Sequence, residues 1–211
     1  MKDIFFTSDH HFGHANIIKY SNRPFAHVDE MNEQLIANWN STVPKGARVY
    51  HCGDIALCDV RDWENIRRRL NGQIYLLNGN HEYTANETPE LFVWIKDYFK
   101  LKVDDPEANV GERNQGRQEV VLFHYPIASW DKHHHGAWHL HGHCHSNHNG
   151  WKAEHMPNAR SLDIGIDSVA LYLGRGKAIP ENYRPLSYFE VREFMRAKRG
   201  ENVDHHVGSR P

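Results

Sequence analysis

The sequence predicts a single α/β domain, and three observations support this. In the first half, short apolar runs alternate with amphipathic stretches, and this strand–helix–strand order indicates parallel strands. Several of the apolar runs stop at a turn that contains glycine. The length of 211 residues is within the range that one hydrophobic core can serve. We expect the domain to cover residues 1–200 and a flexible tail to occupy 201–211.

Buried strands are predicted in the first half wherever a short run of β-prone apolar residues stops at a turn. These runs lie at 4–9, 47–55 and 73–82. Between them, apolar residues recur every three or four positions, which is the helical period. This spacing predicts helices at 29–39, where Asp29 is a candidate N-cap, and at 62–72.

The second half of the chain is richer in predicted strands. Pro89 after Thr88 suits the first position of a helix, which Leu91, Ile95 and Phe99 would continue. Ser187-x-x-Glu190 is a capping-box pattern that precedes a last helix. Further strands are expected at 101–105, 119–126, 139–143 and 161–167. The polar segments 104–117 and 144–158 are expected to be loops and are candidates for substrate selection.

Histidine is unusually frequent, with 18 residues in the chain. It is the commonest metal ligand and titrates near neutral pH, so composition alone indicates metal binding or acid–base chemistry. The formal charge is −2. A protein that holds duplex nucleic acid by its phosphates usually has a basic excess, so strong duplex binding is not expected. A small phosphate-bearing ligand remains compatible with this charge.

The three cysteines predict a reducing compartment, because their number is odd and their spacing does not suggest disulfides. No apolar run approaches the ~20 residues that cross a membrane. The opening MKDIFFTSDHHFGH has too short an apolar run for a signal peptide. We therefore expect a cytoplasmic protein.

Side chains that can ligate metal ions follow the predicted strands one after another. They are Asp9, His11, Asp54, Asn80, His124, His143 and His145. They can meet if the carboxyl ends of the strands converge. One tetrahedral ion uses four ligands, so seven ligands with one shared carboxylate suit two ions. Imidazole, carboxylate and amide together favour divalent first-row metals, and Mn, Fe, Zn, Ni and Co are the candidates.

These ligands belong to five ordered motifs that resemble the signature of the calcineurin-like metallophosphoesterases. The motifs are Asp9-His10-His11, Gly53-Asp54, Gly79-Asn80-His81-Glu82, His124 and Gly142-His143-Cys144-His145. The segments SDHHFGHANIIKYSNRPF, HYPIASW and HLHGHCH also resemble a compact bacterial and phage subgroup of predicted phosphoesterases. The resemblance covers about two thirds of the chain and implies a four-layer sandwich of two mixed β-sheets flanked by helices.

The resemblance also implies a role for each ligand. One metal would be held by Asp9, His11 and His145, the other by Asn80, His124 and His143, and Asp54 would bridge both. A hydroxide shared by the two ions would attack phosphorus in line. His81 would stabilise the transition state or assist the leaving group, and Glu82 would support the turn.

The substrate is less well defined by the sequence. Arg23 is a candidate for holding a phosphate in bidentate fashion, or else a surface or capping residue. His14 and Asn16 are candidates for the mouth of the pocket. The main hypothesis is hydrolysis of a small phosphate monoester or diester, for which a nucleotide is one candidate. The alternatives are a nuclease or nucleic-acid end-processing phosphatase, and a non-catalytic metal-binding scaffold.

Overall fold

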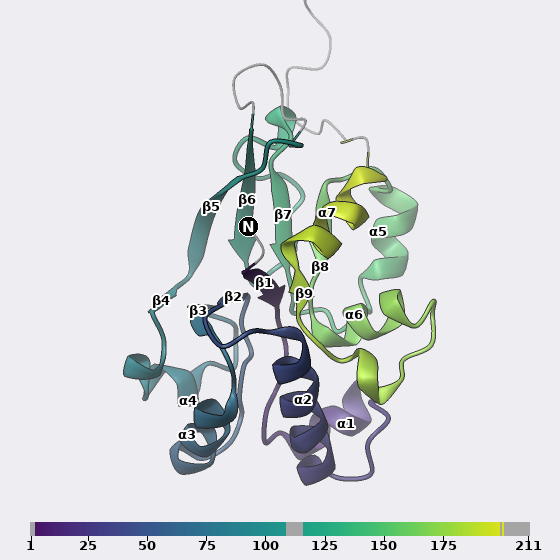
Figure 1. The fold of residues 1–211 in the computed structure, drawn as a ribbon. Coiled ribbons are helices and arrows are strands. Elements are labelled where there is room, and N and C mark those ends of the chain that lie inside the picture. The colour runs from purple at the N-terminus through teal and green to yellow at the C-terminus, as the bar shows by residue number, and fades with distance from the viewer. Residues whose placement is uncertain (1–2, 109–115, 199, 201–211) are drawn as a thin grey trace, which may run out of the picture.

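The computed structural model describes residues 3–108, 116–198 and 200, and its first sheet carries the early motifs (Figure 1). The strand order in this sheet is β4-β3-β2-β1-β9. The bounds are Ile4–Thr7 for β1, Arg48–His51 for β2, Gln73–Leu77 for β3, Trp94–Lys96 for β4 and Leu186–Ser187 for β9. Strands β1 to β4 pair in parallel and β9 pairs antiparallel with β1. The parallel pairing expected for the first half is confirmed.

The second sheet carries the late motifs and has the order β5-β6-β7-β8. Its bounds are Tyr98–Asp104 for β5, Arg117–Phe123 for β6, Trp138–His141 for β7 and Ser161–Asp163 for β8. The β5–β6 pair is antiparallel, whereas β6, β7 and β8 are parallel. Both sheets are therefore mixed, as the predicted fold class requires.

The described part of the chain has seven α-helices, and in the view of Figure 1 they lie below and to the right of the sheets. Their bounds are Ala15–Tyr20 for α1, Val28–Thr42 for α2, Val60–Arg69 for α3, Tyr83–Asn86 for α4, Asn149–His155 for α5, Ile166–Leu173 for α6 and Tyr188–Arg196 for α7. Short 3₁₀ turns occur at Pro89–Leu91, His133–His135 and Pro180–Asn182. Within the described ranges, no helix has both the length and the hydrophobicity needed to cross a bilayer.

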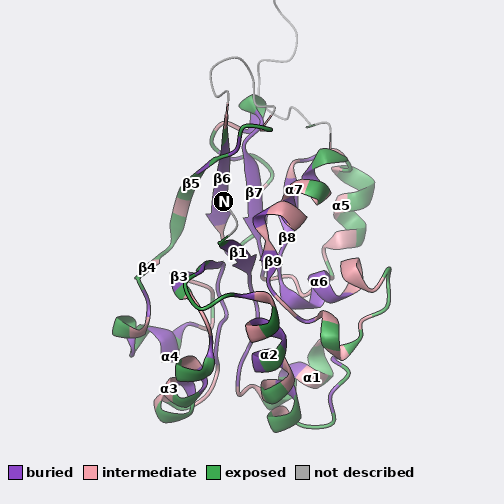
Figure 2. Ribbon diagram, in the orientation of Figure 1, coloured by how far each residue is buried: buried purple, intermediate pink, exposed green. Residues whose placement is uncertain are grey.

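The first sheet is buried on both faces, because alternate side chains of its strands enter different cores. Strand β1 at its centre is coloured as buried in Figure 2. Phe5, Val49 and Ile74 pack against helices α2 and α3. Phe6 and Tyr50 point the other way and pack with apolar residues of the second sheet. Full burial of such side chains stabilises the fold by about 1.5–3 kcal/mol each. The carboxyl ends of β1, β2 and β3 are thereby held beside those of β6 and β7.

The prediction of a helix after Pro89 is wrong. Only the turn Pro89–Leu91 forms there, and the chain continues as β4 and β5. Tyr75 of β3 pairs with Trp94 of β4, and their rings lie 5.3 Å apart. Pairing and packing at the sheet edge thus override the helical spacing of Leu91, Ile95 and Phe99.

Three other boundaries differ from the sequence prediction. Helix α5 forms inside the segment 144–158, which was expected to be a loop. The strand expected at 161–167 ends at Asp163, and α6 begins at Ile166. Helix α2 is capped by His27, whose Nδ1 accepts a hydrogen bond from the Glu30 amide at 3.2 Å, rather than by Asp29.

The capping box before the last helix is confirmed. Ser187 Oγ accepts a hydrogen bond from the Glu190 amide, and Glu190 Oε2 accepts one from the Ser187 amide. The expected tail 201–211 lies outside the described residues, as do residues 109–115 of the polar segment 104–117.

Buried His139 on β7 predicts a loss of stability in acid. Burial lowers its pKa to about 4, although the carbonyl oxygens of Val121 and Tyr125 lie 3.3 and 3.2 Å from its ring nitrogens and oppose the shift. The unfolded chain takes up this proton below an ordinary pKa of about 6.5, whereas the folded ring does not. His139 therefore costs about 2 kcal/mol of stability between pH 7 and pH 5.

Urea unfolding at pH 7 and pH 5 checks this prediction with His139→Gln beside the unmodified protein. The variant is expected to lose less stability on acidification, because it lacks the His139 ring, whose burial opposes protonation. An identical pH dependence of the two unfolding free energies would contradict it.

Candidate metal centre

Five of the candidate ligands lie on turns with a left-handed backbone. Asp9 and His11 follow β1, Asp54 follows β2, and His143 and His145 follow β7; their φ angles lie between +45° and +73°. Residues other than glycine rarely adopt this conformation, and it concentrates at functional sites. The turns after β1 and β2 support each other, because the Asp9 amide donates to the Gly53 carbonyl at 2.9 Å. The strained turns direct the ligands of separate strands toward one place.

Two glycines allow these turns to approach one another. A Cβ atom at Gly79 would overlap Asp54 Oδ1, and one at Gly142 would overlap Ser8 Oγ and Asp9 Oδ2. Only glycine fits where another side chain comes this close to the backbone. The glycines of the Gly-Asn-His and Gly-His-x-His motifs therefore make room for the carboxylates.

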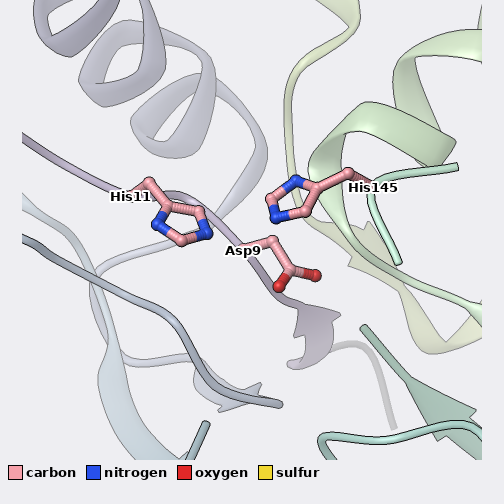
Figure 3. Close-up of side chains that lie close together, drawn as sticks. All are labelled: Asp9, His11 and His145. Carbon is pink, nitrogen blue, oxygen red and sulfur yellow. The ribbon is translucent and has the colours of Figure 1, made fainter. Parts of the chain in front are cut away.

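The first ligand group consists of Asp9, His11 and His145, shown in Figure 3. One ligand atom from each lies within 4.8 Å of the others. Within the described chain, neither ring nitrogen of buried His11 makes a hydrogen bond. His145 Nδ1 lies 2.7 Å from Asp167 Oδ2, which leaves its Nε2 available as a ligand. A buried unpaired nitrogen is costly without a partner, so a cation at this place fits the group.

The second ligand group consists of Asp9, Asp54 and His124, with one ligand atom from each again within 4.8 Å of the others. His124 Nδ1 lies 2.7 Å from the Cys52 carbonyl oxygen. Because a carbonyl only accepts, Nδ1 carries the proton and Nε2 carries a lone pair. A hydrogen bond of this kind is the usual way in which a metal-binding imidazole is oriented.

Asn80 and His143 complete this second group. Asn80 Oδ1 lies 3.0 Å from His124 Nε2 and 2.9 Å from His143 Nδ1. The Asn80 oxygen and the His124 lone pair are both acceptors, so neither can donate to the other. A divalent ion would satisfy both acceptors, which makes the donor set suitable for a metal.

Asp54, a member of the second group, also lies close to the first. Its Oδ1 accepts a hydrogen bond from the His81 amide at 2.9 Å. Its Oδ2 is 3.5 Å from His11 Nε2 and 3.6 Å from His124 Nε2. Asp9 also has a ligand atom in both groups. The structure thus brings all seven predicted ligands together, with carboxylate oxygens shared between the groups.

The electrostatics of the centre favour a bound cation. Burial raises the pKa of Asp9 well above its ordinary value; Asp163 and Asp54 raise it further, and His145 opposes them. Burial and the Asp54 charge raise the pKa of Glu82 to about 8. Glu82 Oε1 accepts hydrogen bonds from the Asp54 and Ile55 amides, so this side chain does support the turn. A cation would offset the mutual repulsion of these buried carboxyl groups.

The ligands of the centre differ in their exposure to solvent. Asp9, His11, Asp54 and His124 are buried, whereas Asn80 is exposed and His81, His143 and His145 are half-buried. The His81 ring centre lies 5.6 Å from that of His11. His14 is half-buried, with its ring centre 5.4 Å from that of His11, and Asn16 is exposed on α1. Contact of His14 and Asn16 with substrate stays a prediction.

The expected contact between Arg23 and a substrate phosphate does not fit the position of this side chain. Arg23 is buried, and all five N–H groups of its guanidinium are used. The Nε and one Nη2 hydrogen bond go to the two Asp167 carboxylate oxygens, each at 2.9 Å. The others go to the Asp9 and His10 carbonyl oxygens at 2.7 and 2.8 Å and to Met31 Sδ. Arg23 therefore braces the turn after β1.

Asp167 is the residue that the sequence argument missed. Its Oδ2 accepts from both Arg23 and His145, so it connects the turns after β1 and β7. Burial opposes ionisation of Asp167, but the Arg23 charge and the hydrogen bonds from His145 and Arg23 hold its pKa below the ordinary value. It lies 22 positions from His145, on α6, so no local spacing connects the two.

Sequence comparison shows the family of the chain. It is 33% identical over 189 residues to protein MJ1445 of Methanocaldococcus jannaschii, described as uncharacterized, covering 89% of this chain and 88% of that protein. The chain belongs to the same family as MJ1445. It is also 27% identical to the gene 66 protein of Mycobacterium phage D29, over 80% of this chain and 89% of the phage protein. No protein-family model matches the sequence.

A solved structure shows the same fold. The Aquifex aeolicus protein AQ665, described as of unknown function, superposes with a TM-score of 0.63 at 20% identity. The match covers 90% of this chain and 98% of the Aquifex chain.

Asp167→Asn is expected to weaken metal binding. The His145 ring would lose the charged acceptor that orients it, and changes of this kind typically weaken metal affinity about 10- to 100-fold. The variant would also lose stability, because Arg23 is left as an unpaired buried charge. Titration of the metal-free protein with Mn²⁺ measures the affinity, and circular dichroism confirms that the variant is folded.

Asp105→Asn is the matched control. Asp105 is likewise a buried carboxylate, accepting from Tyr188 Oη at 2.7 Å and Arg192 Nη1 at 3.2 Å, but it lies away from the centre. It should lower stability without changing Mn²⁺ affinity. Equal Mn²⁺ affinity in both variants would exclude a positioning role for Asp167.

Proposed function

We propose that this protein is a two-metal phosphoesterase that hydrolyses a phosphate monoester or diester. The observation that carries the proposal is the position of Asp54 Oδ2, 3.5 Å from His11 Nε2 in one ligand group and 3.6 Å from His124 Nε2 in the other. The resemblance of the five motifs to the calcineurin-like metallophosphoesterases supports it. Two divalent ions, when bound, would lower the pKa of water and neutralise phosphate charge for in-line hydrolysis.

The proposed ligand sets are those that the resemblance implies. Asp9, His11 and His145 would hold one ion, and Asn80, His124 and His143 the other, with Asp54 shared between them. The buried side chains form the floor of the centre, while Asn80 and His143 lie toward solvent. Since imidazole, carboxylate and amide are all present, Mn, Fe, Zn, Ni and Co are all compatible with the site. Because the Arg23 guanidinium is hydrogen-bonded to Asp167, the two ions would neutralise the phosphate charge.

His81 is the proposed proton donor to the leaving oxygen. Its amide is held by Asp54 Oδ1 at 2.9 Å, so its backbone is anchored to the proposed bridging carboxylate. Its ring is half-buried on the open side of the centre, where a substrate would enter. A proton placed there can reach the departing alkoxide, and such assistance typically accelerates a reaction about 10²- to 10⁴-fold.

Asp54→Asn is expected to abolish turnover and reduce the metal content, because the amide removes the negative charge that the two ions would share. Activity should be measured on a panel of phosphate monoesters and diesters, with Mn²⁺, Ni²⁺, Co²⁺, Zn²⁺ and Mg²⁺ in turn. An unchanged rate on every ester would contradict the mechanism, and inactivity of the unmodified protein on the whole panel would favour a metal-binding scaffold.

His81→Ala is expected to keep both metals and to lose about 100-fold or more in rate, as for a general acid. The exposed His135→Ala serves as the matched control and should keep full activity. Metal analysis beside the rate separates the possible roles of His81. Loss of metal from His81→Ala would identify this residue as a ligand instead.

A further inference from the structure

Three aromatic rings lead across the outer face of the second sheet to the metal centre. The Tyr98 ring centre lies 6.3 Å from that of Phe123, which lies 5.5 Å from that of Tyr125. The Tyr125 ring lies 4.7 Å from the ring of His143, one of the proposed ligands. We call Tyr98, Phe123 and Tyr125 the aromatic strip. It connects an edge strand of the sheet to the open side of the centre.

The aromatic strip is separate from both large cores. In β5, Leu101 and Val103 point inward and are buried, whereas Tyr98 has the opposite orientation and is 41% exposed. Phe123 stands opposite Tyr98 in the β5–β6 register and is half-buried, and Tyr125 is 37% exposed. Tyr98 and Tyr125 therefore leave part of their aromatic surface open to solvent, where a ligand can pack against it.

The charges beside the aromatic strip are largely balanced. Lys100 follows Tyr98 on the same face of β5, and its ammonium lies 2.6 Å from Asp131 Oδ2. Lys132 lies 2.6 Å from Glu119 Oε1. Both lysines therefore have a carboxylate beside them, and the chain as a whole carries a formal charge of −2. A ligand on this face would be held mainly by ring contacts, with little contribution from a basic surface.

We propose that the aromatic strip stacks the bases of a single-stranded oligonucleotide whose phosphodiester enters the metal centre. This inference rests on the proposed phosphoesterase function and names its substrate class. Base–aromatic stacking typically contributes roughly fivefold to a hundredfold in affinity per base, and it tolerates any base because every base has a π-face. A duplex hides those faces between its own base pairs, so a single strand fits this surface and a duplex does not.

The reaction at the centre is then hydrolysis of an internal phosphodiester. One water is consumed, one P–O ester bond breaks, and the products are a phosphate monoester and a free hydroxyl. The proton on the new hydroxyl comes from His81 in the proposed mechanism. The strand on one side of the cleaved bond would remain on the aromatic strip.

Tyr98→Leu tests the proposal without touching a proposed ligand. Leucine keeps an apolar side chain and removes only the ring. For a single-stranded dT hexamer with the Mn²⁺-loaded protein, KM is expected to rise about 5- to 100-fold with little change in kcat. The KM of bis(p-nitrophenyl) phosphate, which has only one ring on each ester arm, should stay the same. Tyr98→Trp should restore the hexamer KM.

Tyr20→Leu is the matched control, because Tyr20 is 72% exposed but lies on α1, outside the aromatic strip. An equal hexamer KM in Tyr98→Leu and the unmodified protein would overturn the inference. Turnover of bis(p-nitrophenyl) phosphate without turnover of the hexamer would also overturn it. So would a loss of duplex hydrolysis in Tyr98→Leu equal to its loss of hexamer hydrolysis. None of these results would count against the phosphoesterase proposal.

Inactivity on every ester would instead count against the phosphoesterase proposal. Fluorescence anisotropy with a labelled dT hexamer would then still test the aromatic strip by binding alone. A weaker affinity in Tyr98→Leu than in Tyr20→Leu would support the inference, and equal affinities would overturn it.

Discussion

Two buried carboxylates, Asp9 and Asp54, lie beside imidazole nitrogens whose lone pairs accept no hydrogen bond. The structure around them depends on how the negative charge of these carboxylates is compensated. Carboxylates removed from water repel each other and need positive charge nearby. His145 offsets part of this repulsion at Asp9, whereas His11 and His124 offer lone pairs to the same space. A pair of divalent ions would complete the balance, which connects the electrostatics of the core to the proposed phosphoester chemistry.

The surrounding structure holds this unfavourable arrangement in place. The ligands lie on left-handed turns, and each turn is tied to another strand by the close approach of glycine or by Glu82. Arg23 and Asp167 join the turn after β1 to α6 and orient His145. Strain of this kind persists only where the surrounding contacts outweigh it. The parallel strands supply those contacts by burying apolar side chains on both faces.

The sequence predicted the convergence of the ligands, because Asp9, Asp54 and His143 each follow a strand and the carboxyl ends of parallel strands meet. Segments whose structure depends on distant partners were harder to predict. The stretch after Pro89 has helical spacing but pairs with β3, and Asp167 acts on residues far away in the chain. Arg23 had the right chemistry for a phosphate, and only the folded structure shows that Asp167 and the carbonyl oxygens of Asp9 and His10 take its donors.

The stoichiometry and coupling of bound Mn²⁺ test the two-metal centre most directly. Equilibrium dialysis of the metal-free protein against Mn²⁺, combined with electron paramagnetic resonance of the loaded protein, counts the ions and reports whether they share a bridging ligand. We predict two ions per chain with a spin-coupled signal. One ion per chain, or two ions with only uncoupled signals, would contradict a centre bridged by Asp54.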